Sequence, residues 1–350
     1  MMKTTHTKNL LNAMGLTGLL KKLFNYFSIF TIVIGSIFGT LNSAYAADGD
    51  DGTGEVVDGA SLTATDANGL LIDADGDGAI AIAVDPNGGI TFGTAGDDDA
   101  ITSDSTGAAA TTFTITDSNT TSIDTLTLAG DIEIGDADND DTMILTLTNA
   151  NLSIGNNIAV GAATNTVAIN AGSGGDVTIT VDNDAAEAQG IAATITGSTN
   201  TVTLNVTDTG GNAGHTTFSK AVSVTNLNIN PTDDETAEVT FDAAVTATTI
   251  TLGNSTDAVD DDTTVFFEAQ TADHTVAGTI DNAVAADETA IHVFDANNSA
   301  KPDTITFSGN IGSTIAVDAI TIGSTSRGGD AIFSGNVSAT ALNIIGGNHL

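Results

Sequence analysis

The stretch that decides the fold reads Phe218-Ser-Lys-Ala-Val-Ser-Val-Thr-Asn-Leu-Asn-Ile229, and its spacing recurs. A Phe is followed by a β-branched residue four positions on, and then by an apolar pair five and seven positions further. The same pattern begins at Phe241 and at Phe333, and a degraded copy begins at Phe307. Adjacent copies are offset by about 23–26 residues, a period typical of repeat architectures. In a continuous strand, the five-residue step would place the apolar pair on the opposite face from the β-branched residue. The step therefore predicts a corner at that place in each copy.

The chain around this stretch, from about residue 60 onward, consists of short runs that alternate Val, Ile or Leu with Thr, Asn or Ala. Alternation with β-branched residues predicts strands, and the Gly, Asn and Asp clusters between the runs predict turns. Several runs end in an apolar-x-apolar-Gly pattern such as Ile250-Thr-Leu-Gly253. No run has helical periodicity. Clear examples of the alternation are Ala79–Val84, Thr112–Thr116, Asp124–Leu128, Val177–Val181 and Thr201–Val206.

A repeat of this length, built of short strands and turns, is the size of one coil of a β-solenoid. We therefore predict an all-β fold, a parallel β-solenoid (β-helix) over residues 61–350, with coils of about 23–26 residues that continue beyond the end of this chain. Alternate residues fill the core, and outward Thr, Asn and Asp form ladders. Tandem β-sandwich domains are the alternative. A sandwich needs about 100 residues for its seven strands, but the irregular spacing through residues 60–200 leaves this alternative open.

The first 46 residues have the three parts of a secretory signal peptide. Four lysines and no acidic residue precede an apolar run from Phe27 to Phe38, and the segment ends in the small-x-small site Ala44-Tyr-Ala46. The apolar run is shorter than the roughly 20 residues that a membrane-spanning helix needs. We predict cleavage after Ala46, a flexible acidic lead-in over residues 47–60, and an extracellular or cell-surface location.

The charge is strongly one-sided after the predicted cleavage site. All 45 acidic residues lie there, and only Lys220, Lys301 and Arg327 oppose them. Nucleic-acid affinity comes mainly from clustered Lys and Arg, so this balance excludes a nucleic-acid reader. It also argues against binding an anionic membrane surface. Such self-repulsion is relieved by bound cations or by spreading the charge over an elongated surface. The chain has no cysteine, which excludes disulfides, thiol catalysis and thiolate metal sites.

Two acidic stretches have the spacing of calcium ligands. In each, carboxylates at alternate positions converge on one side of a tight loop, as in the first half of an EF-hand loop. The position of the closing acid of the first loop is occupied by Val84, and no flanking helices are predicted, so neither stretch is an EF-hand. We expect Ca²⁺-binding turns between strands, with solvated Asp-rich turns as the alternative. The candidate ligands are Asp73, Asp75, Asp77, Asp136, Asp138 and Asp140.

No catalytic constellation is evident, and we expect no enzymatic activity. The carboxylates are too numerous to identify an acid–base pair, and the three cations are scattered over different repeats. There is no Trp, and both Tyr residues precede residue 47, so aromatic side chains for stacking sugars are scarce. No nucleophile elbow or phosphate-binding loop is present. Four histidines share no ligand spacing and are expected to be surface or turn residues: His215, His274, His292 and His349.

The sequence resembles bacterial β-strand-repeat surface proteins. Three features carry this resemblance: the Phe-x-x-x-Val repeats at Phe218, Phe241 and Phe333, the Ile-Thr-Leu-Gly and Ile-Thr-Ile-Gly endings, and the bias toward Thr, Asn, Asp and Gly. This group includes S-layer-like proteins and repeat adhesin or autotransporter-type passengers. The resemblance covers most of residues 60–350. It implies a long, exported, often Ca²⁺-stabilised and usually non-enzymatic protein.

These observations together predict an exported structural segment of a surface layer or fibrous cell-surface protein. An adhesin, in which the solenoid is a stalk that presents a binding tip, is the first alternative. A polysaccharide-active β-helix enzyme is the second. The expected partners are copies of the chain, other cell-surface components or surface glycans, and no membrane span is expected after cleavage.

Overall fold

The structure is a computed structural model, and the residues that it describes all belong to one compact unit. The chain divides into Met1–Asp48 and Gly49–Leu350, and the described residues lie in the second. The predicted signal peptide and lead-in therefore lie outside them. The described ranges are 61–62, 70–74, 80–86, 89–93, 101–105, 110–117, 123–134, 142–161, 165–172, 174–183, 188–207, 214–229, 237–253, 262–270, 272–285, 288–296 and 303–345.

The described residues form 28 strands in two sheets, and they contain no helix that could cross a membrane. All strand pairings between them are parallel, as in the ladder of β17, β20, β22 and β24. The 11-stranded sheet consists of β2 (Leu70–Ala74), β5 (Ile101–Ser105), β8 (Ile132–Ile134), β11 (Ile158–Val160), β14 (Gln189–Ile191), β17 (Gly214–Phe218), β20 (Ala237–Phe241), β22 (Asp262–Ala269), β24 (Glu288–Asp295), β26 (Val317–Ile322) and β28 (Ala339–Ile344).

The second sheet has 17 strands. Most coils contribute two short strands to it, and these strands stack on the corresponding strands of the coils before and after. The 17-stranded sheet consists of β1 (Ser61–Leu62), β3 (Ile80–Val84), β4 (Ile90–Phe92), β6 (Ala110–Thr116), β7 (Thr125–Leu128), β9 (Thr142–Thr148), β10 (Asn151–Ile154), β12 (Thr166–Ala171), β13 (Val177–Asp182), β15 (Ala193–Gly197), β16 (Val202–Thr207), β18 (Val222–Ser223), β19 (Asn226–Ile229), β21 (Val245–Leu252), β23 (His274–Asn282), β25 (Thr304–Phe307) and β27 (Asp330–Phe333).

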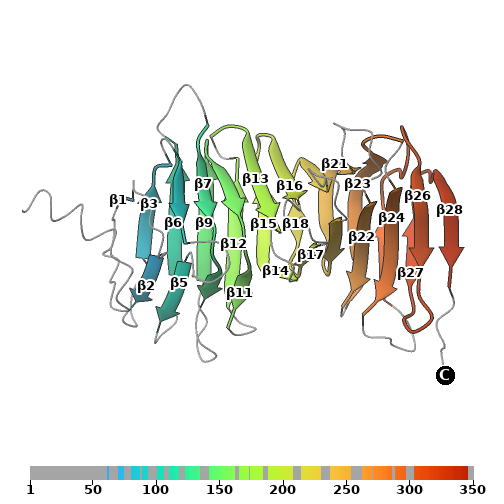
Figure 1. Cartoon of the computed structure of the whole chain (residues 1–350), viewed down its shortest axis with the longest axis horizontal. Helices are drawn as coiled ribbons and strands as arrows, with labels where there is room; N and C mark the ends of the chain where they lie inside the picture. Colours follow the sequence, from blue (N-terminus) through green and yellow to red (C-terminus); the bar gives the residue numbers. More distant parts are fainter. Residues whose placement is uncertain are drawn as a thin grey trace, which may run out of the picture. The chain divides into compact units, whose positions relative to one another are not determined.

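One coil runs from β17 through β18 and β19 to β20, so the chain returns to the 11-stranded sheet one strand further along. Phe218 pairs there with Phe241, its counterpart in the next copy of the repeat. Other coils are longer, such as the one that separates the paired residues Ile158 and Ile191. Figure 1 shows the coils following one another in sequence order. The predicted parallel β-solenoid is therefore confirmed, and tandem sandwiches are excluded because their sheets are antiparallel.

The core is filled by alternate residues of each strand. In β13 and β22, buried and partly exposed residues alternate along the strand, as expected for a strand with one face inward. Five phenylalanines are among the largest fully buried side chains: Phe113, Phe218, Phe241, Phe267 and Phe307. Burying a side chain of this size contributes about 2–3 kcal/mol, so each of these rings adds to the stability of its coil.

Four of these rings and Phe333 form a continuous stack along the core. The ring centroids are 5.1 Å apart for Phe218 and Phe241, 5.8 Å for Phe241 and Phe267, 5.3 Å for Phe267 and Phe307, and 5.2 Å for Phe307 and Phe333. These separations lie in the range of favourable ring pairs. The third contact is edge-to-face, at an interplanar angle of 84°.

The copies of the Phe repeat do not all lie in the same sheet. Phe218 and Phe241 end strands of the 11-stranded sheet, whereas Phe307 and Phe333 end strands of the 17-stranded sheet. The change of sheet coincides with the edge-to-face contact in the ring stack. The repeat therefore marks a corner of the coil, where a buried ring precedes a turn, and not one fixed position along the coil.

The expected corner between the β-branched residue and the apolar pair is present between β18 and β19. In the next coil the same step falls inside the single strand β21, where the pairing with β23 shifts register between Thr246 and Thr249. A bulge thus replaces the corner, since one extra residue in a strand also restores inward alternation.

Outward polar side chains form ladders between coils, as predicted. Asn228 donates from Nδ2 to Asn205 Oδ1 at 2.9 Å. Asn226 links its two neighbours, because its Nδ2 donates to Thr203 Oγ1 at 3.3 Å and its Oδ1 accepts from Thr249 Oγ1 at 3.0 Å. Each such bond contributes about 1 kcal/mol and fixes the register of successive coils.

Candidate functional site

The predicted calcium ligands fall almost entirely outside the described residues. Of the six candidates, only Asp73 has a described backbone. It lies within β2, where it pairs with Asp104 of β5. This places the first predicted ligand at a strand position instead of in the loop. The other five, which are Asp75, Asp77, Asp136, Asp138 and Asp140, lie outside the described residues.

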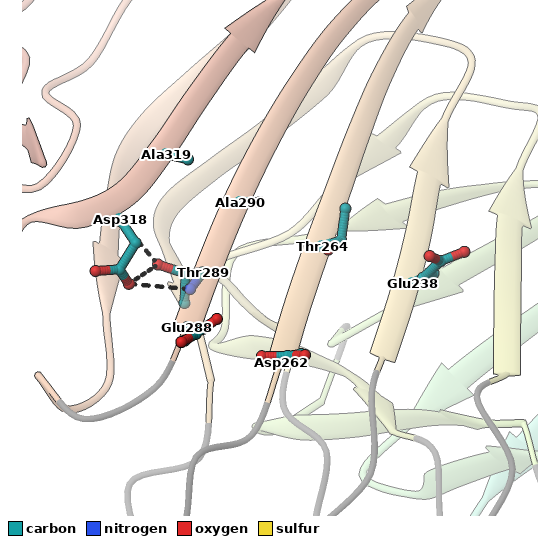
Figure 2. A pocket seen from close by; sticks show the side chains of 8 residues that line it. All are labelled: Glu238, Asp262, Thr264, Glu288, Thr289, Ala290, Asp318 and Ala319. Carbon is teal, nitrogen blue, oxygen red and sulfur yellow. Dashed lines mark hydrogen bonds between the residues drawn. The ribbon is translucent and has the colours of Figure 1, made fainter. Parts of the chain in front are cut away.

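A different acidic site is visible where strands of the 11-stranded sheet begin. A pocket of about 350 Å³ lies over β20, β22, β24 and β26. Figure 2 shows the carboxylates of Asp262 and Glu288 at the starts of their strands, with Glu238 on the neighbouring strand. Small side chains leave the space open between them. The lining residues are Glu238, Asp262, Thr264, Glu288, Thr289, Ala290, Asp318 and Ala319.

One wall of the pocket is held by a hydrogen-bonded cluster. The carboxylate of Asp318 accepts from the Thr289 backbone N–H at 3.0 Å, and the Asp318 N–H donates to Thr289 Oγ1 at 3.3 Å. Thr289 Oγ1 donates to Asn282 Oδ1 at 2.7 Å, and Asn282 Nδ2 donates to the Ala316 carbonyl at 2.8 Å. Thr289 and Asn282 are buried, so this wall is rigid and Asp318 serves to position it.

The other carboxylates give the pocket its negative potential. Asp262 and Glu288 are direct partners in the register of β22 and β24, and strands in a sheet lie about 4.8 Å apart. Like charges at directly opposite positions are destabilising. Among the described residues, however, no group of three or more His, Asp or Glu side chains could hold a metal ion. The described residues here therefore form an acidic surface pocket.

A row of rings lies on the outer face of the same strands. Phe266 stacks on His292 at 5.1 Å between centroids and on His215 at 5.9 Å, and His292 lies 5.6 Å from Phe294. At the far end, the Arg327 guanidinium lies over the Phe294 ring at 5.9 Å. Because the ring faces contact one another, they are not free to stack on a sugar ring.

The charged groups beside the rings are also paired. Arg327 Nη1 donates to Glu268 Oε1 at 2.7 Å. His215 Nδ1 lies 3.3 Å from Glu238 Oε2, and its Nε2 lies 2.8 Å from Thr240 Oγ1. These contacts join side chains from different coils, so the row stabilises the stack of coils.

The histidines in this region are partly exposed strand residues, so of the two expected places, surface or turn, they occupy the surface. His215 lies in β17, His274 in β23 and His292 in β24, whereas His349 lies outside the described residues. Burial lowers the pKa of the His292 imidazole below its usual 6.5, although the Glu238 carboxylate opposes this shift. The His292 Nδ1 is buried and has no hydrogen-bond partner. The folded protein therefore favours the neutral imidazole.

Replacing His292 with Phe should stabilise the protein, increasingly so as the pH falls below about 6.5. The unfolded chain binds a proton near that pH while the folded state does not, so the wild-type protein loses stability on acidification until the lowered folded pKa is reached. Phe keeps the ring stack, and it removes both the titrating group and the unpartnered Nδ1. Loss of the unpartnered Nδ1 should raise the free energy of unfolding by about 1 kcal/mol at neutral pH. Urea unfolding at about pH 7.5 and about pH 5.5 brackets the histidine range.

His292→Gln is the control, because it removes the titration but also the ring contacts. It should flatten the pH dependence without the gain at neutral pH. If the wild type and His292→Phe lose stability equally on acidification, the assignment of this titration to His292 is wrong.

Sequence reasoning missed the acidic pocket and the ring row. Their members come from strands of successive coils, which lie far apart along the chain. Because the coils differ in length, no fixed sequence spacing connects these residues. The only signal in the sequence was the pair of outward aromatics Phe266 and Phe294, each next to an inward residue of its strand.

The fold and this surface define the class of the protein as a parallel β-solenoid with an acidic, polar exterior. No family model, no curated protein and no solved structure matches the chain.

Proposed function

We propose that the chain is an exported structural segment of a cell-surface layer or surface fibre, without catalytic activity. The observation that carries this proposal is the continuous parallel ladder from β2 to β28. The outer face of the 17-stranded sheet is likewise tied from coil to coil by Asn and Thr side chains, as at Asn205 and Asn228. Such a ladder gives a stiff, elongated element, which suits a load-bearing surface role.

The state of the reactive side chains favours this role over a polysaccharide-active enzyme. Arg327 is the only arginine in the sequence, and it is engaged with Glu268 and Phe294. His215 is held between Glu238 and Thr240. These groups, which a lyase or hydrolase would need near its substrate, instead bridge different coils.

Deletion of the gene tests the proposal. Loss of a regular surface layer or of surface fibres in electron micrographs of cell envelopes is the expected result. An intact envelope with reduced attachment to surfaces or host glycans would contradict the structural role and favour the adhesin. Cleavage of polysaccharides by the purified chain would contradict the absence of catalysis.

Calcium stabilisation is part of the same proposal. It rests on the ligand spacing of the Asp73–Asp77 and Asp136–Asp140 stretches and on the acidity of the chain. Weak binding is sufficient, because extracellular calcium modules work with Kd values of about 10⁻⁴–10⁻³ M. Chelation with EGTA should lower the melting temperature by several degrees, and Ca²⁺ but not Na⁺ should restore it. Circular dichroism measures the transition.

Matched variants separate specific binding from charge screening. Asp75→Asn together with Asp77→Asn should reduce the response to EGTA. Asp262→Asn together with Glu288→Gln removes the same charge from the pocket and should leave the response unchanged. A melting temperature that EGTA does not alter would refute calcium stabilisation.

A further inference from the structure

The outer face of the 17-stranded sheet carries two rows of small polar side chains, which we call the Thr/Asn face. The strands β7, β10, β13, β16, β19 and β21 stack on one another, and their registers align the members of each row. The second row consists of the residues two positions further along the same strands, which are three Thr, two Asn and one Ser. Each member of both rows is at least partly exposed. The first row consists of Thr125, Asn151, Thr178, Thr203, Asn226 and Thr249.

The Thr/Asn face is uncharged, although the chain contains 45 acidic residues. Outward positions of the 11-stranded sheet carry carboxylates instead, as at Glu133, Glu238 and Glu288. Asp182 lies beside the second row in β13, and Asp281 of β23 lies at its end. A neutral strip of this kind favours a neutral partner that forms hydrogen bonds.

The side chains of the Thr/Asn face are held in place. Asn226 bonds to Thr203 and Thr249, as described above, and the Thr178 N–H donates to Asn151 Oδ1 at 2.8 Å. The inward residues between the two rows are buried, as at Ile179 and Leu204. A hydroxyl group has one donor and two acceptor lone pairs, so a Thr in these ladders keeps capacity for a further hydrogen bond. The face is therefore a rigid, regular array of hydroxyl and amide groups.

The two periods of this array follow from the geometry of the sheet. Neighbouring strands lie about 4.8 Å apart, and alternate residues of one parallel strand lie about 6.6 Å apart. A partner that meets the whole array at once must itself be a lattice of hydrogen-bonding groups with similar periods.

Ice is such a lattice. Its oxygens are hydrogen-bonded at tetrahedral angles, so an O–H···O distance of about 2.75 Å places second-neighbour oxygens about 4.5 Å apart and gives a repeat of about 7.3 Å along the unique axis. Both periods of the face lie within about a tenth of these values. The difference between strand spacing and ice spacing is about 0.3 Å per coil, so several adjacent coils stay in phase.

We propose that the Thr/Asn face binds the surface of ice crystals. Fixing a water molecule at a protein surface loses entropy in the liquid, but the waters of ice are already fixed. A charged side chain would have to give up part of its hydration on such a contact, and the face has none. The inference goes beyond a structural role and does not depend on it.

Other occupants fit the face less well. Protein interfaces are enriched in aromatic residues, Met and Arg, and neither row contains any of them. The same lack of aromatic side chains disfavours a crystalline polysaccharide, which stacks its sugar rings on them.

Thermal hysteresis, the gap between the melting and freezing temperatures of a small ice crystal, tests the proposal in a solution of the purified chain. The wild-type chain should open such a gap and should also be taken up into slowly growing ice. Thr180→Tyr places a large ring in the middle of the second row and lifts its neighbours away from a flat crystal, so both effects should fall several-fold. Thr217→Tyr is the matched control, because Thr217 is an outward residue of β17 in the 11-stranded sheet, and this variant should behave as the wild type.

Circular dichroism establishes that the variants fold. If Thr180→Tyr does not, Thr127→Tyr in the same row, two coils earlier, provides the same measurement. A wild-type chain without thermal hysteresis, or equal activity in Thr180→Tyr and Thr217→Tyr, would overturn the proposal. So would binding to insoluble cellulose or chitin, or self-association in sedimentation velocity, that Thr180→Tyr abolishes while uptake into ice persists.

Discussion

Replacing Gly278 with alanine is expected to cost about 3–5 kcal/mol of unfolding free energy. Gly278 has a φ of +126°, a conformation that costs other residues about 1–3 kcal/mol. A Cβ at this position would lie 2.2 Å from the Ala247 carbonyl oxygen. The backbone would have to move to relieve this overlap, which adds an overpacking cost of about 1–3 kcal/mol.

The overlap is severe because Gly278 belongs to a column of closely approaching backbones. A Cβ on Gly309 would lie 1.9 Å from the Gly278 oxygen, and one on Gly335 would lie 2.2 Å from the Gly309 oxygen. The column begins at the bulge between β21 and β23. One and two coils further on, it lies between β25 and the bridge residue Ile311 and between β27 and the bridge residue Val337. Displacing one member therefore disturbs the pairing of the coils on both sides.

Gly89→Ala provides the control for backbone conformation alone. Gly89 also has a positive φ, of +84°, but a Cβ there would meet nothing within 4 Å. We expect a loss of about 1 kcal/mol for this variant. Chemical denaturation followed by circular dichroism compares the two, since the chain lacks Trp. Equal losses for Gly278→Ala and Gly89→Ala would show that the close approach is not important.

The sequence predicted the turn glycines but not this column. In the apolar-x-apolar-Gly endings, Gly253 and Gly323 have φ values of +85° and +73°, as suits a residue that ends a strand. The interval from Gly278 to Gly309 is longer than the interval from Gly309 to Gly335, so no fixed period connects these glycines. Their shared role depends on which backbones lie in register, and that is set by coils of different length.

The same limit applies to the strands and the acidic pocket. The spacing of Phe218 and Phe241 predicted their pairing, because both close the same type of coil. The spacing of Phe307 and Phe333 predicted a pairing as well, but in the other sheet. Inward residues repeat because the core must be filled in every coil. Outward residues such as Glu238 and Glu288 obey no such constraint, so their convergence left no pattern in the sequence.

Replacing Phe241 with alanine should cost about 3–5 kcal/mol. Phe241 is fully buried and is the middle ring between Phe218 and Phe267, so truncation opens a cavity and breaks two ring contacts. In a stack of coils each unit is stabilised mainly by its neighbours. The loss should therefore weaken the coupling between the coils before and after β20, and urea unfolding of the variant should broaden or separate into two transitions.

Phe333→Ala is the matched control, because this ring ends the stack. It is only partly buried and contacts one ring, that of Phe307. Its truncation should cost about 1–2 kcal/mol, since less apolar area is lost, and unfolding should keep the wild-type cooperativity. If both variants lose the same free energy, each ring contributes only its own burial. The stack would then not couple the coils, and the stiffness expected of a surface element would have to come from the backbone ladders and their Asn and Thr side chains.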